Sequence, residues 1–255
     1  MKRRQLLGYA GAGLATAFVS TLGSNFQADA QSSGLSVQWL GHTSFLFTGG
    51  GARILVNPFR TIGCTVRYRP PKVTADLVLI SSQLLDEGAV DGLPGNPKLV
   101  YEPGVYDFKG IKFQGISIAH DRKNGRQFGM NTAWKWTQGG VNILHLGGAA
   151  APISIEQKIL MGRPDVLLVP VGGSDKAYNA QEAKQAIEAL NPKLVIPTHY
   201  RTQAADPAAC DIAPLDEFLT LMQGVTVRRS NSDSINISSG NLPETSTVQV
   251  LSYKF

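Results

Sequence analysis

Short hydrophobic runs, broken by glycine or proline, dominate the chain and predict a protein rich in β-strands. Residues 77–81 are a nearly continuous apolar run, as expected for a strand buried on both faces. Residues 111–119 and 131–137 instead alternate apolar and polar positions. The full set of predicted strands is 35–40, 44–48, 53–57, 77–81, 111–119, 131–137, 141–146, 166–170, 194–197, 225–227 and 248–253.

Helical patterns are fewer. The clearest is 181–190, which has small or apolar residues at helical intervals and stops at Asn191-Pro192. Residues 153–161 and 215–223 are two further predicted helices, each followed by glycine. The polar segment 230–247 is predicted to be an exposed loop. Neither a repeat nor a linker interrupts 31–255, so this region is predicted to be a single domain.

The first 30 residues have the pattern of an export signal. Arg3-Arg4 precede a mildly apolar stretch rich in glycine and alanine, and Ala28-Asp29-Ala30 forms an A-x-A cleavage site. The paired arginines favour a twin-arginine signal over an ordinary secretory signal or an uncleaved anchor. The predicted destination is a periplasm or a thylakoid lumen. No later stretch of about 20 apolar residues predicts a membrane span after cleavage.

Charge and cysteine content bear on nucleic-acid binding, on a possible anion site and on a possible disulfide. The formal charge of +5 includes +2 from the signal, which has three basic residues and one acidic residue, so +3 remains. That charge is too small to predict nucleic-acid binding. The basic residues Arg60, Arg67, Arg69 and Lys72 favour a solvated loop over an anion site. An oxidising compartment would allow Cys64 and Cys210 to pair, but the sequence leaves their pairing open.

Several polar motifs occur in a fixed order along residues 35–225. They are Gly41-His42-Thr43-Ser44-Phe45, Asn57-Pro58, Ser81–Glu87, His120, His145-Leu146-Gly147-Gly148, Pro170–Gly173 and Pro197–Thr202. In this order they resemble the metallo-β-lactamase superfamily, and within it the branch of small metal-dependent hydrolases that contains L-ascorbate-6-phosphate lactonase. The resemblance implies an α/β fold, a four-layer αββα sandwich, with a metal site at the strand ends between two sheets.

The same resemblance implies which residues would bind metal. The superfamily motif Ser-His-x-His-x-Asp-His falls on residues 81–87, where Ser82, Leu84 and Glu87 stand in the histidine places and Asp86 keeps its identity. The first metal position would use Ser82, Leu84 and His120, and it is predicted to be lost because leucine cannot ligate a metal. The second metal position falls on Asp86, Glu87, Gly148 and His199, with Gly148 in the place of the superfamily's bridging aspartate. Of these, Asp86, Glu87 and His199 could still hold one zinc, manganese or iron ion.

Two hypotheses follow. All four histidines fall on motif positions, so they are predicted to line one pocket. The predicted pocket residues are His42, Asn57, Ser82, Leu84, His120, His145 and Gly148. The favoured hypothesis is a pseudoenzyme without metal, which binds a small molecule or a protein partner. The alternative is a hydrolase of an ester, lactone or phosphoester that uses one metal ion, with His120 or His145 handling protons or substrate. In a purely structural interpretation, Asp86 and Glu87 face water or cap the next segment, and His120 and His199 bond to backbone carbonyls or to each other.

Overall fold

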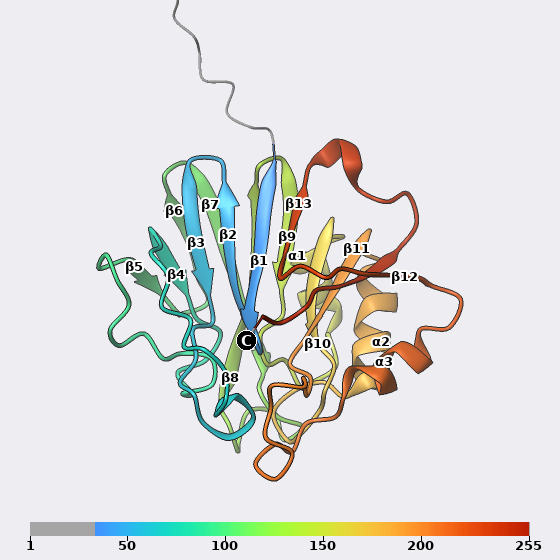
Figure 1. The fold of residues 1–255 in the computed structure, drawn as a ribbon. Coiled ribbons are helices and arrows are strands. Elements are labelled where there is room, and N and C mark those ends of the chain that lie inside the picture. Colours follow the sequence, from blue (N-terminus) through green and yellow to red (C-terminus); the bar gives the residue numbers. More distant parts are fainter. Residues whose placement is uncertain (1–33, 255) are drawn as a thin grey trace, which may run out of the picture. The chain divides into compact units, whose positions relative to one another are not determined.

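The computed structural model describes residues 34–254, so the predicted export signal at 1–30 lies outside the described residues. Two β-sheets face each other across a hydrophobic core (Figure 1). The first sheet has six strands in the order β13 (Ser234–Ile237), β1 (Leu35–Gly41), β2 (Ser44–Gly49), β3 (Ala52–Val56), β4 (Leu77–Leu79) and β5 (Lys98–Val100).

The second sheet has eight strands. Their order is β12 (Thr226–Arg229), β14 (Thr247–Val250), β11 (Leu194–Thr198), β10 (Val166–Pro170), β9 (Val141–His145), β8 (Met130–Gln138), β7 (Ile111–Ala119) and β6 (Gly104–Phe108). Strands β9, β10 and β11 run parallel, so their carboxyl ends lie at one edge. In open α/β sheets, this is the edge where ligands bind.

Aromatic side chains fill the space between the sheets. Phe47 on β2 meets Trp136 on β8 edge to face, with ring centroids 4.9 Å apart. The fully buried Trp134 donates its indole N–H to the carbonyl of Ile80, just after β4, at 3.0 Å. This bond fixes the end of β4, and with it the start of the motif at 81–87, against the second sheet.

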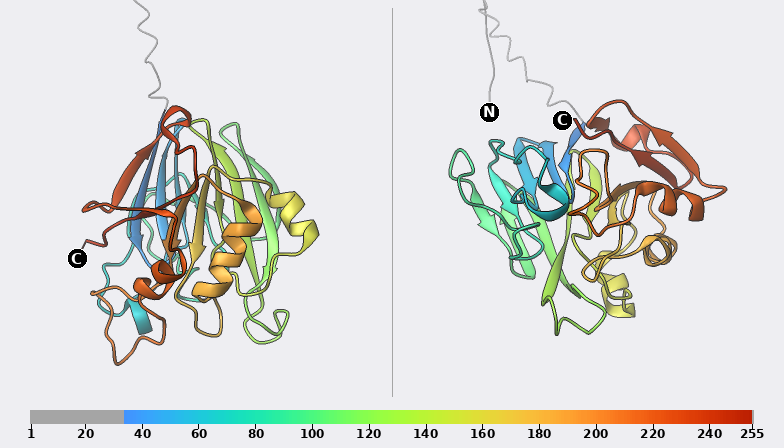
Figure 2. Two further views of the ribbon diagram at one scale, coloured as in Figure 1. Left: turned by 90° about the vertical axis from the view of Figure 1, so that its right-hand side faces the viewer. Right: turned by 60° about the horizontal axis from the view of Figure 1, so that its bottom comes forward.

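The three predicted helices are present as α1 (Ile155–Met161), α2 (Ala180–Leu190) and α3 (Leu215–Leu221). The side chains of Ser154 and Asn179 cap the first two helices through capping boxes. Helix α2 ends at Asn191, which has left-handed backbone angles. Helix α1 packs on β7, α2 packs on β10, and α3 packs on α2, so all three lie beside the eight-stranded sheet (Figure 2).

Loops cover the outer face of the six-stranded sheet. A separate hydrophobic cluster there joins Leu46, Leu55 and Val78 of the sheet to Ala75 and Ile80, with Val73, Val90 and Leu93 packed against it. The predicted α/β fold class is confirmed. Within residues 34–254, the chain between β3 and β5 contains the short 3-10 helix η1 (Gly63–Thr65) and no α-helix. Over the same range, no helix is long and apolar enough to cross a membrane.

The prediction of an uninterrupted loop at 230–247 is wrong. This segment contains β13, which pairs with β1 so that Ile235 and Ile237 lie opposite Val37 and Leu35. A second 3-10 helix, η2 (Ser239–Asn241), follows it. The strand is only four residues long and lies at an edge, so its pattern is too short to be read from the sequence. The short strands β5 and β6 were not predicted for the same reason.

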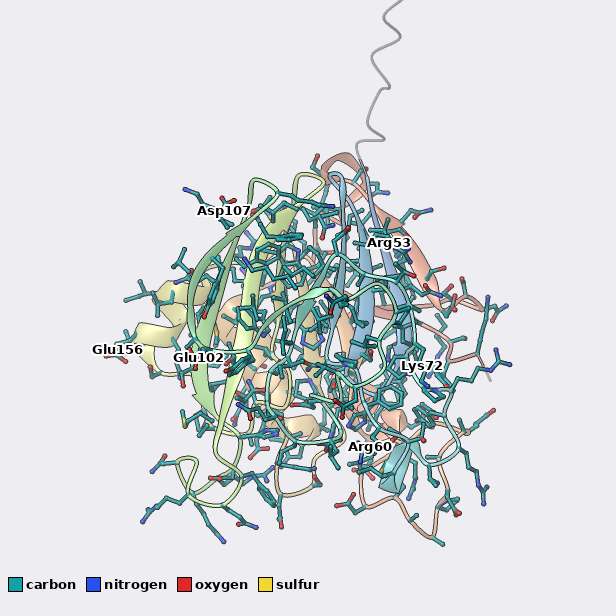
Figure 3. All side chains as sticks on the ribbon, turned by 90° about the vertical axis from the view of Figure 1, so that its left-hand side faces the viewer. Arg53, Arg60, Lys72, Glu102, Asp107 and Glu156 are labelled. Carbon is teal, nitrogen blue, oxygen red and sulfur yellow. A yellow bond between two sulfur atoms is a disulfide. The ribbon has the colours of Figure 1, made fainter. Side chains whose placement is uncertain are left out.

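The basic residues between 60 and 72 lie on exposed loops. Arg60 is paired with Asp91 at 3.7 Å, and Arg67 with Asp206 at 2.9 Å. Arg60 and Lys72 are labelled on the surface in Figure 3. Exposed pairs of this kind contribute little to stability, and their arrangement fits the solvated loop expected from the sequence.

Candidate functional site

The motif residues gather where strands of both sheets end. His42 lies between β1 and β2, Asp86 and Glu87 follow β4, His120 follows β7, and His199 follows β11. His42 and His199 have positive φ angles of 52° and 50°. Left-handed backbone at residues other than glycine is uncommon and often marks functional sites. The loops that bear His42, Asp86, His120 and His199 thus begin at strand ends.

A cavity of about 420 Å³ opens between these loops. From the predicted set, it is lined by His42, Leu84, Asp86 and His199. Leu85 and Ile62 add apolar surface to the lining. The other predicted pocket residues, Asn57, Ser82, His120, His145 and Gly148, are buried behind the lining.

Asp86 does not face the cavity alone, because the ammonium group of Lys176 forms an ion pair with its carboxylate. Both side chains are largely buried, with 17% of Asp86 and 29% of Lys176 exposed. Burial by itself would raise the pKa of Asp86. The fields of His42 and of the Lys176 ammonium outweigh that effect and hold this pKa below its ordinary value. Asp86 is therefore an ionised carboxylate with a built-in counter-ion.

His42 and His199 form a buried pair beside this ion pair. Their ring centroids lie 4.5 Å apart. Burial lowers the pKa of His42 to about 4 and that of His199 well below its ordinary value, so both rings are neutral at pH 7. The described part of the chain offers no hydrogen-bond partner to Nε2 of His42 or Nδ1 of His199, and both atoms are buried. The pair therefore carries two unsatisfied polar atoms behind the cavity wall.

Glu87 points away from this cavity and toward His120. Its Oε2 accepts a hydrogen bond from Ser82 at 3.3 Å and lies 3.6 Å from Nε2 of His120. Burial raises the pKa of Glu87. Nδ1 of His120 contacts the carbonyl oxygen of Gly148 at hydrogen-bonding range. Glu87, Ser82 and His120 thus form a buried polar cluster next to the cavity, in which Oε1 of Glu87 and Nε2 of His120 have no hydrogen-bond partner among the described residues.

The space in front of Gly148 is taken by this cluster. A Cβ atom at residue 148 would lie 2.7 Å from Nδ1 of His120 and 3.0 Å from Oε1 of Glu87, and closer still to Cε1 of the His120 ring. Contacts below 3.0 Å require a neighbour to move. The position where the resemblance expects a bridging aspartate therefore has no room for a side chain.

His145 and Asn57 hold the loops in place. The backbone N–H of Gly147 donates to Nδ1 of His145 at 3.0 Å, so Nε2 carries the proton and donates to the carbonyl of Thr43, also at 3.0 Å. The amide oxygen of Asn57 accepts the backbone N–H of Ser81 at 2.8 Å. With both ring nitrogens bonded to backbone, His145 holds the site together and has no nitrogen left for the proton or substrate role that the hydrolase hypothesis gave it.

The residues present do not fit the metal centre that the resemblance implies. Across residues 34–254, no group of three or more histidine, cysteine, aspartate or glutamate side chains is arranged to hold a metal ion. Asp86, Glu87 and His199, predicted as residual ligands, form no such group, because Asp86 is paired with Lys176 and Glu87 turns toward His120. Leu84 has no donor atom to offer.

A disulfide lies at the rim of the cavity. Cys64 and Cys210 are bonded, with Cα atoms 4.2 Å apart, and join the loop around η1 to the loop that follows β11. Both loops contribute to the lining, through Ile62 and Thr65 on one side and Asp211 on the other. The pairing that the sequence left open is therefore formed, and it rules out a free catalytic thiol at Cys64.

Lys176 is the functional candidate that sequence reasoning did not identify. It follows the Pro170–Gly173 segment, which had been matched to a strand-to-helix unit, yet no motif position pointed to a lysine there. The available signal was a basic residue a few positions beyond a strand end at the ligand-binding edge of the sheet. Asp211, which also lines the cavity, was not identified either. It follows Cys210, and the sequence alone did not show that the disulfide brings this loop to the site.

Comparison with known proteins identifies the family. Residues 36–199 match the model of the "Beta-lactamase superfamily domain". The UPF0173 metal-dependent hydrolase of Thermococcus onnurineus is 29% identical over 201 residues, which cover 68% of this chain and 89% of that protein. A Thermoplasma acidophilum protein of the same name is 24% identical over 195 residues, which cover 66% of this chain and 84% of that protein.

Solved structures agree with this result. A Thermotoga maritima protein described as a Zn-dependent hydrolase of the metallo-β-lactamase superfamily matches with a TM-score of 0.66 and 27% identity, covering 85% of this chain and all of that one. Igni18, a metallo hydrolase from Ignicoccus hospitalis, shares the fold with a TM-score of 0.58 and 17% identity, covering 80% of this chain and 99% of that one. The chain therefore belongs to the metallo-β-lactamase superfamily, through its beta-lactamase superfamily domain.

Proposed function

We propose that this protein binds a small organic molecule in the cavity between His42, Asp86 and His199, and that it does so without the metal centre of its superfamily. The observation that carries the proposal is the ion pair between Asp86 and Lys176. It places an ammonium group on the motif carboxylate that faces the cavity. The protein would then be a binding or assembly protein that uses a hydrolase fold.

The cavity itself supports a small-molecule ligand. Its volume of about 420 Å³ lies within the range of roughly 300–1,000 Å³ typical of ligand sites. Leu84, Leu85 and Ile62 supply apolar walls, while His42, Asp86 and His199 supply a few polar lining groups. Apolar walls with a few convergent polar groups are the usual composition of such sites.

A substrate screen and a ligand screen test this proposal together. We expect no hydrolysis of esters, lactones or phosphoesters above the level of an Asp86→Ala, His199→Ala double variant, with or without added zinc. We also expect small molecules that raise the melting temperature of the wild type but not of Leu84→Asp. Turnover that disappears in the double variant would contradict the proposal.

The second candidate function is hydrolysis of an ester, lactone or phosphoester with a single metal ion. Two observations favour it: the relatives are named metal-dependent hydrolases, and Asp86, His42 and His199 line one cavity. The ligand types suit zinc, manganese or iron. A metal would have to displace Lys176 from Asp86, so this candidate requires a rearrangement that the binding proposal does not. The lactonase branch remains a prediction from sequence resemblance.

We further propose that the protein works outside the cytoplasm, in a periplasm or a thylakoid lumen. The disulfide between Cys64 and Cys210 supports this location, because such bonds persist mainly in oxidising compartments. The test is to replace Arg3 and Arg4 by lysine in the producing cell. The twin-arginine interpretation predicts that the variant accumulates in the cytoplasm at full length; unchanged export would contradict it.

A further inference from the structure

We propose that the ammonium group of Lys176 is the built-in cation of this site and keeps divalent metal ions off Asp86. The inference rests on the proposed metal-free function and extends it, because it names the residue responsible. It assigns to Lys176 a role that no motif position indicates.

The backbone around Lys176 is held firmly toward the site. The N–H of Gly172 donates to the carbonyl of His199 at 2.9 Å, which ties the start of this loop to the His199 loop. Further along, the N–H of Gly173 donates to the carbonyl of Tyr178 at 2.9 Å, closing a turn around Lys176. The N–H of Tyr178 donates to Ala149 at 2.9 Å and anchors the far end of the turn. Backbone hydrogen bonds on both sides of Lys176 therefore fix the loop that carries it.

The side chain of Lys176 is also more enclosed than an ordinary surface lysine. Only 29% of it is exposed, and its Nζ lies 6.0 Å from the centre of the Phe128 ring while it pairs with Asp86. An ammonium at this distance from an aromatic face gains a cation–π contact. Two separate contacts thus hold the charge in one position.

A metal ion and this ammonium would compete for the same carboxylate. Zinc is bound by carboxylate oxygens and imidazole nitrogens, among other ligands, and His42 and His199 line the same cavity as Asp86. With Lys176 in place, an incoming dication would meet a like charge already bound to Asp86. These three side chains are not arranged around a metal in the structure; without Lys176, the freed carboxylate and rotation of the two rings would let a zinc ion gather them. Removal of the lysine charge should therefore create zinc affinity.

The test is zinc titration by calorimetry on the chelator-treated protein without its signal at 1–30, followed by thermal unfolding with and without zinc chloride. We expect Lys176→Met to bind one zinc at least about tenfold more tightly than the wild type. Saturating zinc should raise the melting temperature of this variant by about 3 °C or more and leave the wild type unchanged. Lys176→Gln serves as a second charge-removing variant if the methionine variant fails to fold.

Three controls make the result specific. Lys184→Met removes an equal charge from the exposed pair with Glu188 on α2 and should gain no zinc affinity. Lys176→Arg keeps the charge and should behave like the wild type. Adding Asp86→Asn to Lys176→Met should abolish the gain.

The outcomes separate the two proposals. A wild type that already holds one tightly bound zinc sinks the proposed function and this inference with it. A metal-free wild type whose Lys176→Met and Lys176→Gln variants gain no zinc affinity sinks only the role of Lys176. A gain that survives Asp86→Asn also contradicts the inference, because the zinc would then lie elsewhere.

Discussion

The disulfide at the cavity rim leads to the most quantitative prediction. Replacing Cys64 and Cys210 by alanine, or reducing the bond, removes a cross-link between residues 146 positions apart in the sequence. Other contacts join the same two loops in the folded state, among them the hydrogen bond between Tyr68 and Thr202 at 2.6 Å. We therefore expect the native fold to persist without the bond. The main effect should be a gain in the conformational entropy of the unfolded chain.

The magnitude follows from the length of the closed loop. For a loop of this size, the chain-entropy relation gives a stabilisation of roughly 5 kcal/mol at 25 °C. Residual structure in the unfolded chain reduces such values, so we expect a loss of about 2–5 kcal/mol. Each kcal/mol shifts the melting temperature of a domain of this size by roughly 2–4 °C. The loss corresponds to a decrease of about 4–20 °C.

Urea unfolding of the oxidised, reduced and double-alanine proteins measures this effect. The reduced wild type and the variant should lose similar free energy, and their m-values should rise because a chain without the cross-link exposes more surface on unfolding. Reductant should have no effect on the variant. A loss below about 1 kcal/mol would refute the reasoning, since the bond would then constrain little of the unfolded chain.

Three further predictions concern single side chains. Gly148→Ala should cost about 1–3 kcal/mol in denaturant unfolding, because its Cβ would collide with His120; an unchanged midpoint would show that the ring moves freely. Trp134→Ala should cost about 3–5 kcal/mol by the same assay, since it removes a fully buried indole and its bond to Ile80. Asp121 accepts four backbone N–H groups, which overcome the opposing effect of burial and hold its pKa at about 2. The ionised carboxylate of Asp121 should contribute fully to the free energy of unfolding above pH 4, and this contribution should disappear as the pH falls toward 2. The melting temperature of Asp121→Asn should therefore change less between pH 4 and 2 than that of the wild type. The same acid sensitivity in both proteins would contradict this.

The fold was implied by the resemblance of the motifs to a superfamily, whereas local patterns in the sequence predicted the longer helices and strands. The nine-residue alternation at 111–119 became β7 with the same bounds, and the helical spacing at 181–190 became α2 with one added residue. The short strands β5 and β13 carry too few residues for a pattern to form. Their positions depend on pairing partners far away in the chain, such as Leu35 for Ile237.

The site was predictable only as far as motif positions reach. The loops bearing His42, Asp86 and His199 do converge on one cavity, as their order along the chain suggested. The ion pair with Lys176 joins residues 90 positions apart and follows no motif, so sequence spacing could not reveal it. The direction of Glu87 was equally hidden, because it depends on how its side chain packs against His120.

The measurement that tests the central claim most directly is the metal content of the protein, purified without chelator or histidine tag. Elemental analysis would compare the wild type with the Asp86→Ala, His199→Ala double variant. The ion pair between Asp86 and Lys176 leads us to expect far less than one zinc, manganese or iron per chain in both proteins. Close to one metal ion per chain in the wild type, absent from the double variant, would contradict the metal-free account and establish the single-metal site.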